Sequence, residues 1–178
     1  MRILKTKIKS LFVVKQKNNF DKRGMLRETF NKKIFNNKNF VFEYCTTSKK
    51  NVLRGFHFQT KFKQSKYVNV IKGKILDVVI DLRKRSKTFG KSFKIILSQD
   101  NALGLFIPAG FAHAYYSFQK ENIIYYKLDN YYSPKFESGI VYNDTDIKIN
   151  WPRKNMLISK KDKNLKSFKE FKKIHKYL

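Results

Sequence analysis

Along most of this chain, hydrophobic and polar residues alternate with a period of two, which is typical of β-strands. In the clearest stretch, 74–82, the even-numbered positions from 76 onward are aliphatic, whereas Asp77 and Asp81 fall on the other face. Only Lys72 and Gly73 separate this stretch from the apolar residues before it. A two-residue connection of this kind predicts a β-hairpin between 67–71 and 74–82.

Similar short stretches recur along the chain, separated by Gly, Pro, Asn and Asp, which favour turns. Residues 21–24, Asp-Lys-Arg-Gly, are such a turn, and 25–35 is expected to be a strand followed by a helical turn. Further strands are expected at residues 8–14, 40–46, 52–59, 93–97, 104–107, 112–118, 123–128 and 140–142. This pattern predicts a single all-β domain over residues 1–178, with a jelly-roll barrel as the favoured architecture.

The period changes only in the C-terminal tail. Leu165, Phe168 and Phe171 recur at helical spacing among lysines. Ser159, three residues before Asp162, resembles a helix start. We therefore expect a short C-terminal helical segment that lies over the sheet with its apolar side inward.

The composition fits a folded domain, because 42 % of the 178 residues are hydrophobic and 16 % are aromatic. No apolar run approaches the ~20 residues that span a bilayer, and the lysine-rich N-terminus lacks the apolar core of a signal peptide. Cys45 is the only cysteine, so an internal disulfide is excluded. These features predict a cytoplasmic protein without a membrane partner.

The net charge of +27 fits three kinds of partner, namely nucleic acid, an acidic membrane surface and an anionic small ligand. The lysines are spread through the whole chain, however, which favours a solvated basic surface. The sequence contains no zinc-finger spacing, no helix-turn-helix pattern and no aromatic RNA-binding signature. We therefore expect no nucleic-acid partner.

Candidate chemistry centres on residues 54–59, Arg-Gly-Phe-His-Phe-Gln, which hold one of the three histidines. In a regular strand, Arg54 would share one face with the two phenylalanines, and His57 would lie on the other. A histidine near an arginine suits a base that acts on an anionic ligand, whereas a histidine among aromatic residues is often part of the core. The local sequence leaves both interpretations open.

The sequence offers little to metal, nucleophilic or cofactor chemistry. A metal site needs three or four converging ligands, and His57, His113 and His175 stand apart, although separate strands can still bring two of them together. Gly-x-Ser-x-Gly, phosphate-loop and dinucleotide-binding patterns are not present, and nothing near Cys45 would activate its thiol. We expect no metal and no cofactor.

Acid–base catalysis remains as the candidate chemistry, because the expected inner faces of the strands carry side chains that can donate or accept protons. These are His57, Lys66, His113, Tyr125, Tyr126, Tyr131 and Tyr132. Pattern alone favours a different interpretation for the tyrosines, as core residues with hydrogen-bonded hydroxyls.

Blocks of sequence that occur in a fixed order now narrow the interpretation. They are residues 49–59, 73–90, 107–113, 126–134, 143–152 and 157–162. Together they resemble the dTDP-4-dehydrorhamnose 3,5-epimerase family over essentially the whole chain. The resemblance implies a cupin-like jelly roll that acts as a homodimer without a metal or a redox cofactor. It also implies inversion of C3 and C5 beside the 4-keto group of a dTDP-linked 6-deoxysugar.

The resemblance, carried over residue by residue, implies catalytic roles for four side chains. His57 matches the base that removes the proton next to the ketone, and Asp162 matches the carboxylate that pairs with it. Lys66 matches the lysine that stabilises the enolate, and Tyr126 matches the acid that reprotonates the opposite face. A helix cap is a second interpretation of Asp162, and the two roles are compatible.

Seven further positions match ligand contacts of the family. They are Arg54 for the diphosphate, His113 as a second active-site histidine, Tyr132 for stacking on thymine, Arg23 and Glu28 for contacts across the dimer, and Glu137 and Lys161. Arginine and lysine side chains suit a diphosphate because they offer charged hydrogen-bond donors.

The chain departs from the family where Phe42, Glu43 and Tyr44 replace polar Gln and Asn positions, and at Ala114, where glycine is common. Residues 42–44 line the ligand site in relatives, so the exact sugar and the number of carbons inverted stay open. The alternative enzyme is a 3-epimerase or ketoisomerase on a related 4-keto nucleotide sugar. The alternative outside catalysis is a jelly roll that binds a sugar nucleotide or a polyanion.

Overall fold

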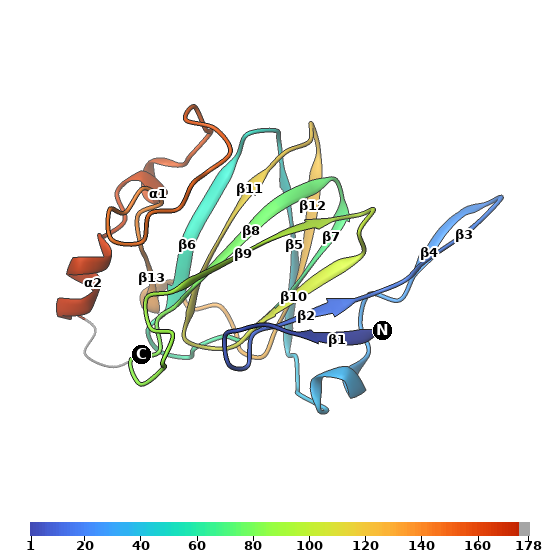
Figure 1. Cartoon of the computed structure of the whole chain (residues 1–178), viewed down its shortest axis with the longest axis horizontal. Helices are drawn as coiled ribbons and strands as arrows, with labels where there is room; N and C mark the ends of the chain where they lie inside the picture. Colours follow the sequence, from blue (N-terminus) through green and yellow to red (C-terminus); the bar gives the residue numbers. More distant parts are fainter. Residues whose placement is uncertain (175–178) are drawn as a thin grey trace.

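The computed structural model describes residues 1–174, which form two antiparallel sheets that face each other (Figure 1). Within these residues, a six-stranded sheet has the order β1 (Arg2–Lys5), β2 (Phe12–Lys15), β10 (Leu103–Ile107), β7 (Lys66–Lys72), β12 (Asn122–Leu128) and β5 (Phe42–Ser48). A five-stranded sheet has the order β13 (Glu137–Gly139), β6 (Leu53–Gln59), β11 (Phe111–Ser117), β8 (Lys74–Asp81) and β9 (Ser92–Ser98). The predicted all-β jelly roll is confirmed.

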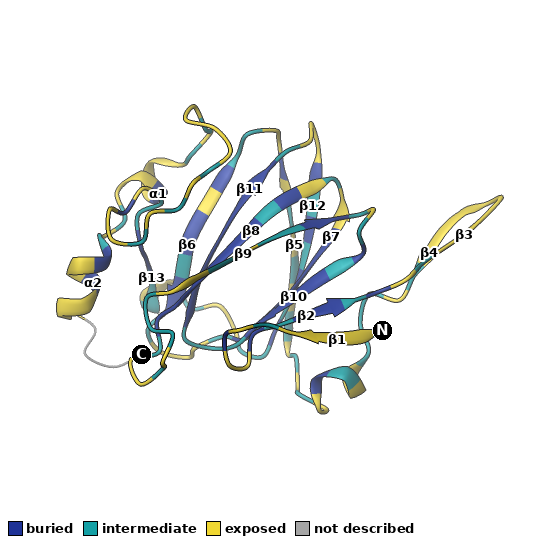
Figure 2. Ribbon diagram, in the orientation of Figure 1, coloured by how far each residue is buried: buried dark blue, intermediate teal, exposed yellow. Residues whose placement is uncertain are grey.

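The main core lies between the two sheets, because apolar side chains of both sheets form one buried cluster. Val13 and Val68 come from the six-stranded sheet, and Ile75, Val79 and Leu97 come from the five-stranded sheet. The central strands are accordingly the most buried part of the chain (Figure 2). Burial of these aliphatic side chains is the main favourable term that holds the sheets together.

The predicted hairpin between 67–71 and 74–82 is wrong. β7 pairs with β10 and β12, whereas β8 pairs with β11 and β9, so the two strands lie in different sheets. Gly73, with φ of +85°, turns the chain from one sheet to the other. The pattern misled because β8 is buried on both faces, and local alternation does not reveal which strand lies alongside.

The N-terminal region differs from the single strand expected at 8–14. The chain forms β1 and β2, joined by a turn that Thr6 holds by donating its hydroxyl to the carbonyl of Leu11 (2.8 Å). The expected turn at 21–24 joins β3 (Asn18–Asp21) to β4 (Gly24–Arg27). This β3–β4 arm projects away from the barrel and is mostly exposed (Figures 1 and 2). The expected helical turn follows as η1 (Lys32–Phe35).

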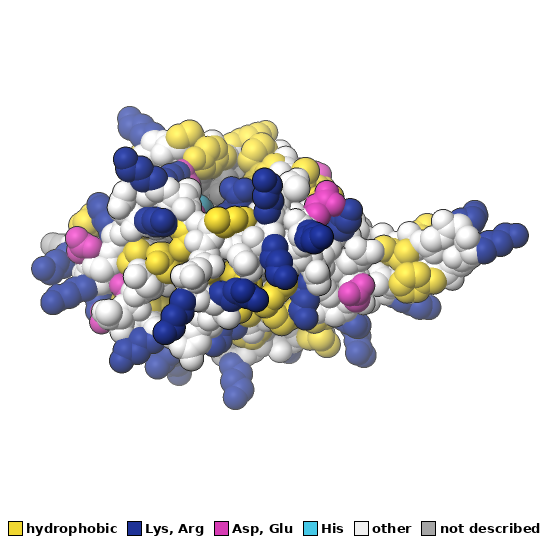
Figure 3. Space-filling model, turned by 90° about the horizontal axis from the view of Figure 1, so that it is seen from above, with side chains coloured by type: hydrophobic (Ala, Val, Ile, Leu, Met, Phe, Trp, Pro, Cys, Tyr) yellow, Lys and Arg dark blue, Asp and Glu magenta, His cyan; other side chains and the backbone are white. Residues whose placement is uncertain are grey.

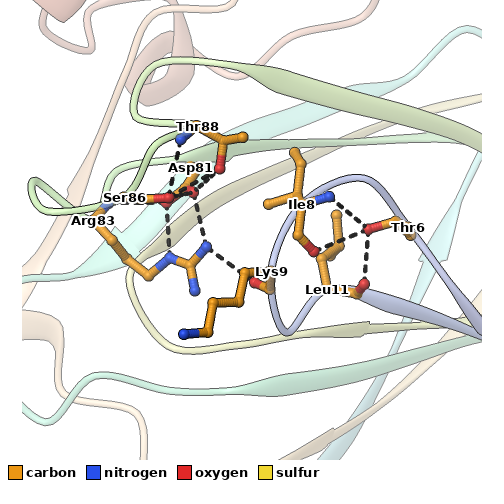
Figure 4. A network of polar contacts seen from close by, with 8 residues as sticks. All are labelled: Thr6, Ile8, Lys9, Leu11, Asp81, Arg83, Ser86 and Thr88. Carbon is orange, nitrogen blue, oxygen red and sulfur yellow. Dashed lines mark hydrogen bonds and ion pairs between the residues drawn. The ribbon is translucent and has the colours of Figure 1, made fainter.

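A charged loop after β8 is tied to the N-terminal turn (Figure 4). Asp81 accepts hydrogen bonds from Arg83 Nε (2.9 Å), Ser86 Oγ (2.6 Å) and Thr88 Oγ1 (2.7 Å). Arg83 Nη2 also donates to the backbone carbonyl of Lys9 (3.1 Å). The buried carboxylate is thereby fully paired, as a buried charge requires, and it orders both loops.

The C-terminal segment crosses the outer face of the five-stranded sheet, after the short η2 (Pro134–Phe136) and an irregular stretch (Figure 1). It contains α1 (Lys160–Lys163) and α2 (Phe168–Ile174). Phe168 and Phe171 are buried in a cluster with Phe58 and Ile80, which confirms the predicted inward apolar side. No helix within residues 1–174 is long and apolar enough to cross a membrane.

Candidate active site

A cleft opens between the two sheets and continues to α1. Its larger part has a volume of about 580 Å³ and is lined by Tyr44, Thr46, Val52, Leu53, Arg54, His57, Lys66, His113, Tyr115, Tyr126, Leu157, Ile158, Ser159, Lys161 and Asp162. A smaller part of about 330 Å³ adjoins it and shares Tyr44, His57 and Lys66 with it. The surface above is visibly hollowed, and lysine and arginine side chains are scattered over the rest of that face (Figure 3).

A β-bulge in β6 places Arg54 and His57 on the same side of the strand. His57 lies opposite His113 and Arg54 lies opposite Tyr115, so β6 takes three steps where β11 takes two. The expectation that Arg54 faces away from His57 is therefore wrong. Gly55 permits the bulge, because its φ is +113° and a Cβ there would lie 2.5 Å from the carbonyl oxygen of His113.

His57 is paired with Asp162 by a hydrogen bond of 2.8 Å between Nε2 and Oδ1. The other carboxylate oxygen accepts the backbone N–H of Gly55 (3.1 Å). Burial alone would raise the pKa of Asp162, but the hydrogen bonds from His57 and Gly55 outweigh burial and lower it. The carboxylate stays ionised at neutral pH and orients the imidazole, whose side chain is 30 % exposed towards the cleft.

The helix start and the histidine partner are both present at α1. Ser159 caps the helix, since its Oγ accepts the backbone N–H of Asp162 (3.0 Å), and the Asp162 side chain stays free to reach His57. A second pair lies deeper, where His113 Nε2 contacts Asp77 Oδ2 at 2.8 Å. Both members of that pair are buried.

Lys66 and Tyr126 occupy the wall of the cleft opposite His57, because β7 and β12 belong to the other sheet. Burial lowers the pKa of Lys66 to about 8, although the negative charges of Glu137 and Asp77 oppose the change. Burial raises the pKa of Tyr126 well above its usual value, so its hydroxyl remains a proton donor. An ammonium, a phenol and an imidazole thus converge on one space.

Two of the tyrosines expected on inner faces do not contribute to the cleft. Tyr125 follows the strand alternation to the outer face, where its hydroxyl donates to Glu43. Tyr131 is largely exposed, and its ring contacts Phe42 (6.2 Å between centroids). Tyr125 and Tyr126 are separated by the alternation of a strand, whereas Tyr131 and Tyr132 lie in the loop that follows β12.

The mouth of the cleft carries Arg54, Tyr132, Glu137 and Lys161. The Tyr132 hydroxyl and Lys161 Nζ both donate to Glu137 Oε2, at 2.6 and 2.5 Å. Burial would raise the pKa of Glu137, but these two hydrogen bonds outweigh it and lower the pKa. Arg54 Nε donates to Ser48 Oγ (3.1 Å), which leaves most of the guanidinium exposed.

Arg23 and Glu28 are not brought to the cleft of their own chain. Arg23 lies at the tip of the β3–β4 arm and pairs with Asp21 at 2.6 Å. Glu28 follows the arm and accepts a hydrogen bond from Asn31 Nδ2 at 2.9 Å. Both therefore stand apart from the other site residues.

The sequence assigned no role in the site to Asp77 or Tyr115, and it marked Tyr44 only as a departure at a position that lines the ligand site in relatives. The signal for Asp77 was available, since this carboxylate interrupts an otherwise apolar face between Ile75 and Val79, and in the structure it pairs with His113. Tyr44 and Tyr115 resemble ordinary strand aromatics, and only the sheet pairing places them in the cleft. Within residues 1–174, no three His, Cys, Asp or Glu side chains are grouped to hold a metal, and His175 lies outside the described residues.

The fold and the cleft together define a jelly-roll protein with a histidine–aspartate pair that faces a lysine and a tyrosine. A family model described as dTDP-4-dehydrorhamnose 3,5-epimerase matches residues 5–170. The chain is 40 % identical over 176 residues to the protein of that name from Methanothermobacter thermautotrophicus, with 95 % of each chain covered. The chain belongs to the dTDP-4-dehydrorhamnose 3,5-epimerase family, as the ordered blocks predicted.

Solved structures agree with this assignment. The dTDP-4-dehydrorhamnose 3,5-epimerase of Elizabethkingia anophelis matches with a TM-score of 0.89 at 35 % identity, covering 96 % of this chain and 97 % of that one. The Legionella pneumophila enzyme in complex with dTDP-4-keto-L-rhamnose matches with a TM-score of 0.89 at 35 % identity, covering 93 % and 92 %. The cupin-like architecture is therefore that of the family.

Proposed function

We propose that the chain inverts C3 and C5 of dTDP-4-dehydro-6-deoxy-D-glucose and yields dTDP-4-dehydro-L-rhamnose. The observation that carries the proposal is the placement of His57 and Tyr126 on opposite walls of one cleft, with Lys66 beside them. Inversion of a carbon requires that a proton leaves one face and arrives at the other. Family membership supports the same substrate class.

In this mechanism, His57 removes the proton next to the ketone while Asp162 holds the ring through its Nε2. The C–H bond electrons move into the enolate, whose oxygen is stabilised by the ammonium of Lys66. Tyr126 then delivers its hydroxyl proton to the opposite face of the same carbon and regains a proton from solvent, while His57 releases to solvent the proton that it removed. The chemistry needs no net oxidation, because each cycle removes one proton and returns one.

We assign Arg54 and Lys161 to the diphosphate, Tyr132 to the thymine ring, and Glu137 and His113 to further ligand contacts. The two cations are exposed at the mouth of the cleft, where a diphosphate can form charge-assisted hydrogen bonds. Tyr132 is exposed beside them, as a stacking surface requires. The polar residues of the mouth thus suit a nucleotide, and the buried residues suit the sugar.

We further infer a homodimer in which Arg23 and Glu28 reach the cleft of the partner. The β3–β4 arm supports this inference, since it projects from the barrel with Phe20 75 % and Leu26 69 % exposed. Apolar side chains on a projecting arm suit burial against a second copy. A cytoplasmic location fits the single exposed thiol of Cys45, which cannot form a disulfide within the chain.

The test is incubation with dTDP-4-dehydro-6-deoxy-D-glucose in D₂O, followed by NMR. Deuterium at both C3 and C5 is the expected result, and His57→Asn is expected to abolish exchange while dTDP binding survives. Exchange at C3 alone would support the alternative 3-epimerase, which the departure from the family pattern at Phe42 and Tyr44, both in the cleft, leaves open. No exchange with this or related 4-keto sugars would leave only a binding protein.

A further inference from the structure

Tyr44 lies against the proposed general acid and has no role in the mechanism above. It stands directly opposite Tyr126 in the pairing of β5 with β12. The two rings are stacked, with centroids 4.7 Å apart and planes inclined by 20°. Cross-strand aromatic pairs with this geometry stabilise each other beyond the area they bury.

We propose that Tyr44 is a positioning residue that holds the ring of Tyr126 in place for proton delivery. The inference rests on the proposed function, since it assumes that Tyr126 is the acid. Tyr126 is enclosed on two sides, by the face of Tyr44 and by His113, whose ring lies 6.2 Å away at 66°. A ring enclosed in this way has little freedom to swing its hydroxyl away from the sugar.

The ring of Tyr44, rather than its hydroxyl, makes the relevant contacts. Among the described residues the Tyr44 hydroxyl has no hydrogen-bond partner, whereas the ring contacts both Tyr126 and Phe42. Burial raises the pKa of Tyr44 to about 12, so the phenol stays neutral and does not compete as an anion for Lys66. A stacking role therefore predicts that phenylalanine can replace Tyr44.

The positioning role has a kinetic signature, because proton removal and proton return use different residues. His57 removes the proton from the opposite wall, and its own proton exchanges with solvent before it returns. Without the Tyr44 ring, deuterium should still enter the substrate through His57, whereas delivery of a proton by a displaced Tyr126 should slow. A displacement of about 1 Å at a catalytic group lowers rates ~10²-fold.

The experiment compares Tyr44→Phe, Tyr44→Ala and Tyr44→Leu in D₂O, with NMR readout of two rates for each protein. One is deuterium uptake into recovered substrate and the other is formation of inverted product. We expect Tyr44→Ala and Tyr44→Leu to lower inversion at least ~10-fold relative to uptake. Tyr44→Phe should restore the wild-type ratio. Tyr125→Ala, which removes a ring from the outer face of the neighbouring strand, is the matched control and should leave the ratio unchanged.

Two outcomes would overturn this role alone. Equal losses of uptake and inversion in Tyr44→Ala and Tyr44→Leu would indicate lost binding or packing. A loss in Tyr44→Phe as large as in Tyr44→Ala would assign the function to the hydroxyl. Absence of any exchange by the wild-type protein would instead overturn the proposed epimerase, and this role with it. Tyr44→Leu retains apolar bulk, so the comparison survives if Tyr44→Ala fails to fold.

Discussion

His57 acquires its orientation from a carboxylate that lies 105 residues later in the chain. Both oxygens of Asp162 are occupied, one by the imidazole and one by the backbone of Gly55, so the pair has a single geometry. Lys66 illustrates the opposite situation, since its half-buried ammonium loses hydration and its pKa is lowered. At the scale of the residue, Lys66 therefore lowers the stability of the fold while it supplies a cation to the proposed reaction site.

The proposed role of Lys66 predicts one effect of replacing it and one effect of pH on the wild type. Lys66→Met should lower kcat ~10²–10³-fold, the usual cost of removing a preorganised stabiliser of a developing oxyanion. In the wild type, kcat/KM should fall as the pH rises through about 8, because Lys66 then loses its charge. A pH–rate profile of the free enzyme measures this, and activity that stays constant to pH 10 would contradict the enolate role.

The same lysine affects stability in a definite pH window. Its pKa is about 8 in the folded protein against an ordinary value of 10.5, so the unfolded chain binds the proton more tightly. The free energy of unfolding contributed by Lys66 therefore rises between pH 8 and 10.5, and is lowest below pH 8. Lys66→Met should be more stable than the wild type at pH 7, as measured by urea unfolding, and should lose that pH-dependent rise.

At the scale of the element, β6 supplies side chains both to the cleft and to the apolar cluster on the other side of the sheet. Its bulge turns Arg54 and His57 to the cleft, while Phe56 and Phe58 remain in the cluster that packs against α2. A regular strand would offer only one of these two side chains to the ligand. Arg54 and His57, the proposed diphosphate contact and base, are therefore neighbours because one residue is inserted in the ladder.

The bulge predicts a strong effect at Gly55. Gly55→Ala should destabilise the protein by at least about 2 kcal/mol, because the residue has a positive φ and the new Cβ would meet the backbone of His113. Gly24→Ala is the matched control, since Gly24 also has a positive φ but has nothing within 4 Å of a Cβ. Equal losses in urea unfolding would show that backbone conformation alone, and not the close approach, matters at Gly55.

At the scale of the whole molecule, the β3–β4 arm is held to the barrel at its base, where Arg27 donates to the backbone carbonyls of Gln99 and Val70, but its tip projects from the chain. Its tip carries Arg23, and its apolar residues remain exposed. If the arm completes the partner's cleft, Arg23→Ala should raise KM about tenfold without changing the fold, the usual scale for a lost charge-assisted contact. The molar mass measured in solution, for example by light scattering, should be twice that of the 21.3 kDa chain.

Mixing an inactive variant with one that binds substrate weakly tests the exchange of arms directly. His57→Asn damages the cleft and spares the arm, whereas Arg23→Ala damages the arm and spares the cleft. After dissociation and random reassociation, half of the dimers contain one of each, and each of these has one intact site, so about a quarter of the wild-type activity should appear at low substrate concentration. No gain over the two separate variants would place Arg23 outside the partner's cleft.

The sequence supported much of this picture without the structure. The period-two alternation predicted most strands, and the spacing of Phe168 and Phe171 predicted the inward side of the C-terminal helix. The predicted hairpin of β7 and β8 failed, because a tight connection at Gly73 serves equally well as a corner between sheets. The prediction of Tyr125 as an inner residue failed because adjacent residues of a strand face opposite ways, and that of Tyr131 failed because the chain has already left β12 there and the side chain is exposed.

By itself, the sequence determined the fold class, the family and the set of chemical groups, since alternation and ordered motifs are local properties of the chain. Tertiary structure alone decided how these groups meet: the bulge that turns Arg54 beside His57, the burial that lowers the pKa of Lys66, and the stack of Tyr44 on Tyr126. The physical reason is that strand partners and burial depend on residues far away in the chain. A local pattern specifies which face a side chain takes in a regular strand, but not what lies opposite it.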